Sequence, residues 1–203
     1  MKNNKVLLTI ALLFTQTIFA GISHAEQMFT IKNGELERPT NYREWIYVGT
    51  PVTPNDMNNG KAAFPEHHNV YIDPKSWAHW KEKGEFRDGT ILIKELVSVG
   101  SKSAVSGNGY FMGNFIGLEA TIKSKKHFHA APGNWASYSF SSADHKTSSK
   151  TAKPFPAKSC NSCHEGAAAD DFVFTQYYPI LSQGKGMKQK AGGGHSDSLK
   201  PIK

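Results

Sequence analysis

The sequence predicts an α+β fold that is mainly β, with an antiparallel sheet and a few short helices. Residues 91–99 and 135–140 alternate at a period of two, which is typical of strands. The Ser/Gly-rich segment 100–109 separates the first of these from another strand-like run, 110–122, as a hairpin connection would. Helical spacing of apolar residues is confined to short segments. Neighbouring strands joined in this way favour an antiparallel sheet.

The expected elements follow one another along the chain with clear boundaries. The strand at 91–99 is apolar on both faces, so it should be central and covered on both sides. The next strand, 110–122, should be broken or bulged at Gly113 and Gly117. Asp73-Pro74 is a strong helix start, and Gly84 a strong stop. The remaining expected elements are a short helix at 42–45, a strand at 69–72, a helix at 74–83 with Trp77 and Trp80 on one face, a polar loop at 141–153, and a helix at 170–178 that Pro179 ends.

One motif carries chemistry: Cys160-Asn161-Ser162-Cys163-His164. Two thiols at this spacing can each add to a vinyl group of one haem, and the adjacent histidine can then bind the iron. The alternatives are a redox dithiol, half of a zinc site, or chance. Zinc would want four ligands, and a redox dithiol would be expected before a helix in a βαβ context. The motif therefore favours one covalent c-type haem, with His164 as its axial metal ligand.

The N-terminus indicates export. Lys2 and Lys5 precede a mostly apolar run at 6–20, and Ser23-His24-Ala25 places small residues at the two positions that a signal peptidase reads. We expect a signal peptide at 1–25, one haem domain at 26–182 and a disordered basic tail at 183–203. Haem attachment outside the cytoplasm agrees with export, so the expected location is the periplasm.

The charge distribution argues against nucleic-acid binding. Of the formal net charge of +7, the signal contributes +2 and the tail +4, which leaves +1 for residues 26–182. A nearly neutral folded body lacks the basic surface that nucleic acids require.

Lys94 is the second residue of interest. It shares a strand face with Leu92 and Leu96, and a lysine in such a place is costly to bury unless it is paired or chemically altered. A lysine that extends to solvent, or one on an edge strand, would explain the same pattern. The pattern alone leaves both interpretations open.

A family resemblance bears on this choice. The runs that carry it are Asn41-Tyr42-Arg43-Glu44-Trp45, Val52-Thr53-Pro54-Asn55, Trp77-Ala78-His79-Trp80, Gly84 to Thr90, Lys94 to Gly100, Ser106 to Gly113, Cys160 to His164 and Val173-Phe174-Thr175. In order and spacing they resemble cytochrome P-460. The resemblance implies a homodimeric, β-rich periplasmic protein that oxidises hydroxylamine to nitrous oxide or other nitrogen oxides. It also implies a covalent bond between a lysine nitrogen and the c-haem, and Lys94 stands at that lysine's place.

Substrate oxidation releases protons, so a base is wanted near the open side of the haem. The candidates are Glu119, on the strand 110–122, and His68 or His67, ahead of the strand at 69–72; each of them can equally be a solvated or structural side chain. His127 and His129 could bind adventitious metal, but two ligands are weak evidence.

Two other functions compete with hydroxylamine oxidation. Cytochrome c′-beta, which is related to the cytochrome P-460 family, has the same β-rich fold, lacks the cross-link and binds nitric oxide in an apolar pocket; the presence of Lys94 favours the enzyme. A simple electron carrier is disfavoured because no methionine pattern indicates a sixth ligand. The expected partners are hydroxylamine and nitric oxide as small ligands, an electron acceptor such as another periplasmic cytochrome, and a second copy of the chain.

Overall fold

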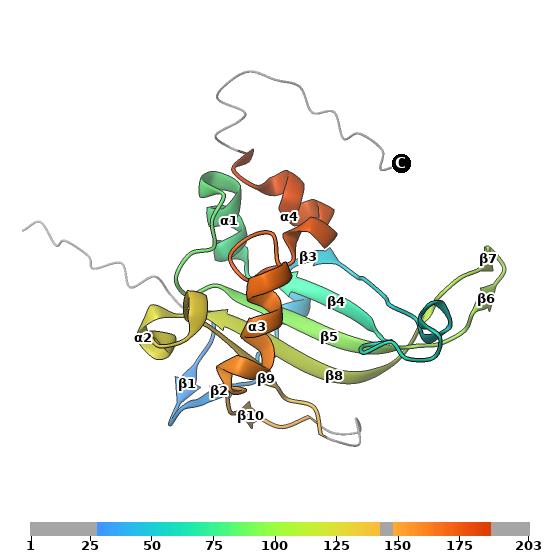
Figure 1. The fold of residues 1–203 in the computed structure, drawn as a ribbon, viewed down its shortest axis with the longest axis horizontal. Coiled ribbons are helices and arrows are strands. Elements are labelled where there is room, and N and C mark those ends of the chain that lie inside the picture. The colour runs from blue at the N-terminus through green and yellow to red at the C-terminus, as the bar shows by residue number, and fades with distance from the viewer. Residues whose placement is uncertain (1–27, 143–147, 188–203) are drawn as a thin grey trace, which may run out of the picture.

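The computed structural model describes residues 28–142 and 148–187. Its central element is a five-stranded antiparallel sheet with the order β3-β4-β5-β8-β9 (Figure 1). The strands are Ile46–Gly49 (β3), His67–Ile72 (β4), Ile91–Val99 (β5), Met112–Lys123 (β8) and Trp135–Ser139 (β9). The predicted mainly β, α+β fold is confirmed.

Smaller elements surround this sheet. A three-stranded sheet joins Ile31–Lys32 (β1), Glu35–Glu37 (β2) and Thr151–Ala152 (β10), and a two-stranded one joins Ser103–Ala104 (β6) and Gly107–Asn108 (β7). The α-helices are Pro74–Lys83 (α1), Lys125–Phe128 (α2), Ala157–Ala167 (α3) and Pro179–Gly184 (α4). The 3-10 helices are Tyr42–Glu44 (η1), Asn55–Asn58 (η2), Pro132–Asn134 (η3) and Thr175–Tyr177 (η4).

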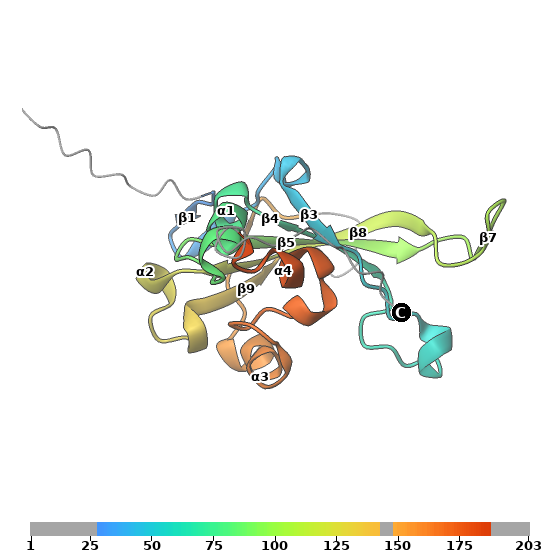
Figure 2. The ribbon, with the colours of Figure 1, turned by 90° about the horizontal axis from the view of Figure 1, so that it is seen from above.

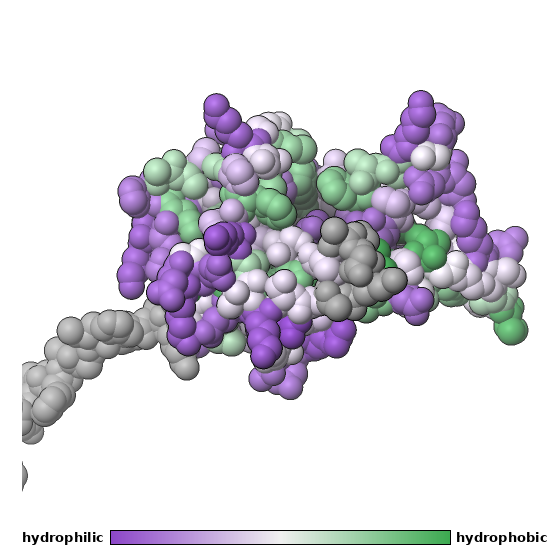
Figure 3. Space-filling model, turned by 90° about the horizontal axis from the view of Figure 1, so that it is seen from below, coloured by the Kyte–Doolittle hydropathy of each residue, from purple (hydrophilic) through white to green (hydrophobic). Residues whose placement is uncertain are grey.

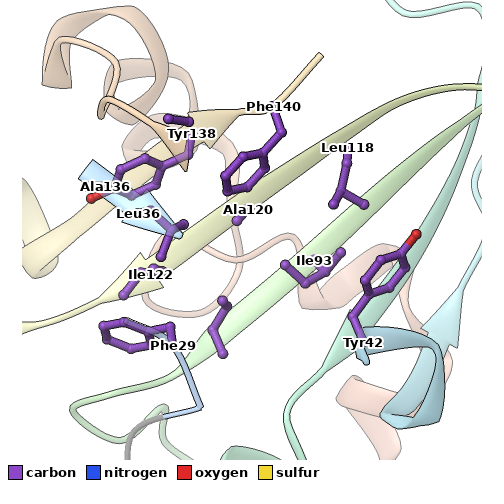
Figure 4. Packing of buried hydrophobic residues seen from close by; sticks show 12 residues of the cluster. Phe29, Leu36, Tyr42, Ile93, Leu118, Ala120, Ile122, Ala136, Tyr138 and Phe140 are labelled. Carbon is purple, nitrogen blue, oxygen red and sulfur yellow. The ribbon is translucent and has the colours of Figure 1, made fainter. Parts of the chain in front are cut away.

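The central sheet is covered on both faces. One face packs against the three-stranded sheet, and its buried cluster includes Leu36, Ile93, Ala120, Tyr138 and Phe140 (Figure 4). We call this the rear face. The opposite face, here the helix-covered face, packs against helices and holds a second cluster: Val48, Val70, Ile72, Trp80, Phe86, Leu92, Trp135, Val173 and Leu181. Figure 2 shows α3 and β1 on opposite sides of the sheet. Burial on both faces explains why β5 is apolar throughout.

The strands and the first helix follow the sequence pattern closely. Helix α1 begins after Asp73, whose side chain accepts a hydrogen bond from Ser76 N at 2.9 Å. It ends at Gly84, which has a left-handed φ of 74°. The register between β5 and β8 shifts beside Gly117 and again near Gly113, as expected for a bulged strand. The 100–109 connection is a hairpin that carries β6 and β7.

The helix expected at 170–178 is wrong. Asp171 and Phe172 have positive φ values of 43° and 65°, and the only helical turn within that range is η4, over Thr175–Tyr177. Pro179 begins helix α4 instead of ending one. A proline at the first position of a helix loses no hydrogen bond, because that N–H has no partner within the helix. Pro179 therefore marks the beginning of a helix and not its end.

The C-terminal part of the described chain extends the expected domain by a few residues. Helix α4 continues to Gly184, and Gly186 N donates to Trp80 O at 3.1 Å. The expected signal peptide and residues 188–203 of the expected tail lie outside the described residues. Within the described ranges, none of the helices is long and apolar enough to cross a bilayer.

Candidate haem site

Helix α3 carries the whole Cys-x-x-Cys-His motif. Cys160 and Cys163 are three positions apart, so their thiols project from neighbouring parts of one helix surface. Both are free thiols, one half-buried and one exposed. Between them, the buried Asn161 donates from Nδ2 to Trp135 O at 3.1 Å. This bond holds α3 against β9 and leaves the two thiols available for attachment.

His164 is oriented as an axial ligand would be. Its Nδ1 lies 2.7 Å from the carbonyl oxygen of Phe172, which can only accept, so Nδ1 carries the proton and donates it. Nε2 then keeps its lone pair for a metal ion. The ring packs against Phe174, with 4.7 Å between the ring centroids. The donor atoms of α3 therefore fit a c-type haem: two free thiols and one preoriented imidazole.

The partner of His164 lies in a tight turn that the sequence did not reveal. Asp170 and Val173 exchange backbone hydrogen bonds around Asp171 and Phe172, both of which have positive φ. Positive φ at both central positions defines a type I′ turn, in which glycine and asparagine are usual. Phenylalanine is not a turn signal. The pair Asp170-Asp171 is the one local signal at this turn, and two acids in sequence are also typical of the first turn of a helix.

Lys94 lies on the helix-covered face of the sheet, in β5, where it is paired. Its Nζ is 2.6 Å from Oε2 of Glu119, its cross-strand partner on β8, and each side chain is 31% exposed. Leu92 and Leu96 on either side are buried. The interpretation of Lys94 as an edge-strand residue is wrong because β5 is hydrogen-bonded to β4 and β8. The structure brings together two of the predicted site residues, Lys94 and Glu119.

His68 joins this pair, and His67 does not. His68 projects from β4 onto the helix-covered face, where burial and the neighbouring Lys94 cation lower its pKa. Its Nε2 lies 3.4 Å from Oε1 of Glu66. Because neighbouring residues of a strand face opposite ways, His67 points to the rear face, where it is buried. Of the two histidines considered as a base, only His68 is on the side of Lys94.

Exposed aromatic rings lie near these groups. Phe64 is 58% exposed, its ring centroid is 5.5 Å from Lys94 Nζ, and it contacts His68 edge-on. Near His164, the exposed Tyr177 stacks on Phe174. Figure 3 shows apolar side chains gathered on the side from which α3 and η2 project, between two hydrophilic projections. Uncovered aromatic surface at both groups suits a large apolar ring such as haem.

Contacts on the rear face explain the run from Asn41 to Trp45. Glu95, next to Lys94, is buried there and accepts hydrogen bonds from Tyr42 OH at 2.9 Å and Asn69 Nδ2 at 3.2 Å. Arg43 forms an ion pair with the same carboxylate. A buried carboxylate needs such partners. Tyr42 and Arg43 therefore stabilise the Glu95 carboxylate on the face of the sheet opposite Lys94.

Among residues 28–142 and 148–187, no group of three or more His, Cys, Asp or Glu side chains could hold a metal ion. His127 and His129 lie at the end of α2, on a different part of the chain from the motif.

Comparison with known proteins agrees with this geometry. The sequence model of the cytochrome P460 family matches residues 39–175, a range that includes Lys94, Glu119 and the Cys-x-x-Cys-His motif. A search of curated proteins finds no match to the chain. The family match covers most of the sequence and implies a haem cofactor. The chain therefore belongs to the cytochrome P460 family of haem proteins.

Proposed function

We propose that the protein is a periplasmic monohaem c-type cytochrome that oxidises hydroxylamine to nitrous oxide or other nitrogen oxides. The observation that carries the proposal is the pairing of Lys94 with Glu119 on the face of the sheet that α3 covers. A lysine for attachment and a carboxylate for proton transfer thus lie together on the side of the proposed haem. A protein that only binds a gas has no need of this pair.

Four residues are proposed to hold the cofactor. Cys160 and Cys163 form the thioether bonds, His164 Nε2 binds the iron, and Lys94 Nζ provides a third covalent attachment. When bound, the haem supplies an iron with one open position for hydroxylamine and a route for the electrons removed from it. The chain's own residues must then position the substrate and accept its protons.

Glu119 is proposed as the main proton acceptor. Its carboxylate is half-buried and at present is paired with the Lys94 ammonium group. A lysine nitrogen bonded to a ring carbon no longer carries that charge. Glu119 would then lose its counter-ion. The attachment of Lys94 would thus leave the carboxylate of Glu119 free to accept a proton from the substrate.

His68 is proposed to act next to Glu119. Its lowered pKa keeps the ring neutral at pH 7, so it is able to accept a proton. Glu66 lies 3.4 Å from its Nε2 and is half-buried. Glu119, His68 and Glu66 therefore offer successive proton-accepting groups on one side of the sheet.

The remaining parts of the proposal concern the setting of the reaction. Cleavage after Ala25 would release the mature chain in the periplasm, where haem attachment takes place. Oxidation of hydroxylamine to nitrous oxide releases two electrons for each nitrogen. Those electrons need an acceptor, which we propose to be another periplasmic cytochrome. We also propose that the protein works as a homodimer.

Turnover measurements on the purified holoprotein test the proposed function. With hydroxylamine and an artificial electron acceptor, the wild type should reduce the acceptor and produce nitrous oxide, measured by gas chromatography. Lys94→Leu should retain haem but lose turnover, whereas Lys126→Leu, a change at an exposed lysine of α2, should retain both. Turnover that survives Lys94→Leu would make the lysine structural. A wild type that binds nitric oxide without oxidising hydroxylamine would favour the function of cytochrome c′-beta.

A further inference from the structure

The imidazole of His164 depends on one backbone carbonyl group. Nδ1–H donates to Phe172 O at 2.7 Å, and this is its hydrogen bond within the described residues. A hydrogen bond to the distant nitrogen of a ligating histidine fixes its ring orientation and raises its basicity toward the metal. The placement of the Phe172 carbonyl therefore affects how strongly His164 donates to iron.

The backbone around this carbonyl is in an unfavourable conformation. Asp171 and Phe172 both have positive φ values, which residues with a Cβ atom rarely adopt. Such conformations persist only when the surrounding structure determines them. Contacts outside the turn must therefore hold it in place.

Asp171 provides those contacts. Its Oδ2 accepts from Lys123 Nζ at 2.5 Å, and its Oδ1 accepts from the indole Nε1 of Trp135 at 3.2 Å. Lys123 and Trp135 are cross-strand partners on β8 and β9, and Trp135 is only 1% exposed. The carboxylate thus connects the turn to a rigid part of the central sheet.

The Phe172 ring adds a steric contact from the same region. A Cβ atom at Gly133, just before β9, would lie 2.6 Å from the Phe172 ring, so only glycine leaves room for it. Gly133 also has a positive φ of 62°. The side chains of both central residues of the turn are therefore fitted to the start of β9.

Trp135 also anchors helix α3, which carries His164. Its carbonyl oxygen accepts from Asn161 in α3, and its indole donates to Asp171 in the turn. The helix that carries His164 and the turn that accepts from His164 are thus anchored on the same residue. The distance between helix α3 and the turn therefore depends on their common contact with β9 and not on the loop that connects them.

We propose that Asp171 is a positioning residue for the axial ligand: held by Lys123 and Trp135, it keeps the Phe172 carbonyl on Nδ1 of His164 and so strengthens the bond between His164 and iron. The inference rests on the haem attachment proposed above, but not on the identity of the substrate. It assigns a role in tuning the haem to three residues that lie outside the attachment motif.

The test is resonance Raman spectroscopy of the reduced holoprotein, which reports the iron–histidine stretching frequency directly. Asp171→Ala should shift this frequency downward and raise the reduction potential, because the imidazole loses basicity. Asp171→Asn should give a smaller shift, since an amide oxygen can still accept from Trp135 and asparagine tolerates positive φ. Trp135→Phe and Lys123→Met each remove one contact and should shift the frequency in the same direction.

Lys126→Met is the matched control for Lys123→Met and should leave the frequency unchanged. An unchanged frequency in Asp171→Ala would overturn the proposal. If that variant does not fold, unchanged frequencies in both Trp135→Phe and Lys123→Met would overturn it equally. The readout needs no hydroxylamine, so a protein that fails to turn over substrate still allows the test. Loss of haem from the wild type would instead contradict the proposed function, and the absorption spectrum would show it first.

Discussion

Glu119→Gln separates the catalytic from the structural role of the Lys94–Glu119 pair. Glutamine keeps the shape of the side chain and an oxygen that can accept from Lys94, but it carries no charge and cannot act as a base at neutral pH. If Glu119 accepts a proton during hydroxylamine oxidation, turnover should fall by about 10²- to 10⁴-fold, the usual contribution of a general base. A 10²-fold loss corresponds to roughly 3 kcal/mol of activation free energy.

The same change should affect stability much less. Before Lys94 is attached the two charges are 2.6 Å apart, but each side chain is 31% exposed, so solvent screens their attraction, and attachment of Lys94 would remove it. Ion pairs of this kind contribute about 1 kcal/mol or less to the free energy of unfolding. A domain is typically stable by about 5 to 15 kcal/mol, so the variant should remain folded. The expected loss of turnover is therefore several times larger, in free energy, than the expected loss of stability.

The assay combines steady-state turnover with urea unfolding of the same samples, after haem content has been matched by absorbance. Glu85→Gln is the control, because Glu85 is an exposed acid on a different part of the chain whose side chain is 73% exposed. It should leave both quantities unchanged. Turnover of Glu119→Gln within about threefold of wild type would remove Glu119 from the proton path, since a base contributes more than that. A loss of stability as large as the loss of turnover would refute the separation of roles.

Two further predictions concern buried polar groups. The buried carboxylate of Asp73 accepts hydrogen bonds from Ser76 N and Ile91 N and lies 3.5 Å from Arg87. Asp73→Ala should therefore lower the free energy of unfolding by roughly 3 to 5 kcal/mol, the usual cost of breaking a buried charge pair. A fall in the urea midpoint equivalent to under about 1 kcal/mol would contradict it. Burial depresses the pKa of His68, so the folded state binds its proton less readily than the unfolded chain. The contribution of this group to the free energy of unfolding is present above about pH 6.5 and is lost on acidification. The free energy of unfolding should therefore fall less steeply between about pH 7 and pH 5 in His68→Gln than in the wild type. Equal slopes in the two proteins would contradict this prediction.

The sheet and the first helix could be predicted because their signals are local. The alternation in 91–99 gives the strand and its buried faces, and Asp73-Pro74 with Gly84 gives both ends of α1. The small sheet was missed because its strands have only two or three residues, too few for a period to be visible. Helix α3 was not predicted either, because the Cys-x-x-Cys-His motif indicates haem attachment and does not indicate a secondary structure.

The site was only partly predictable for a different reason. The thiols, His164 and Lys94 are recognisable from sequence because each belongs to a motif. The register that sets Glu119 opposite Lys94 depends on bulges beside Gly117 and near Gly113, and their exact position is not visible in the sequence. The carbonyl that accepts from His164 belongs to Phe172, whose positive φ is imposed by Asp171, Trp135 and Gly133. Tertiary contacts determine that turn, so no local pattern could reveal it.

The most direct test of the central claim is a mass spectrum of the digested holoprotein. We predict one species in which haem joins the peptide that contains Lys94 to the peptide that contains Cys160 and Cys163. The Lys94→Leu variant, digested in parallel, should give haem on the cysteine peptide alone. Finding that same simpler species in the wild type, with the Lys94 peptide free and unmodified, would contradict the cross-link and with it the case for hydroxylamine oxidation.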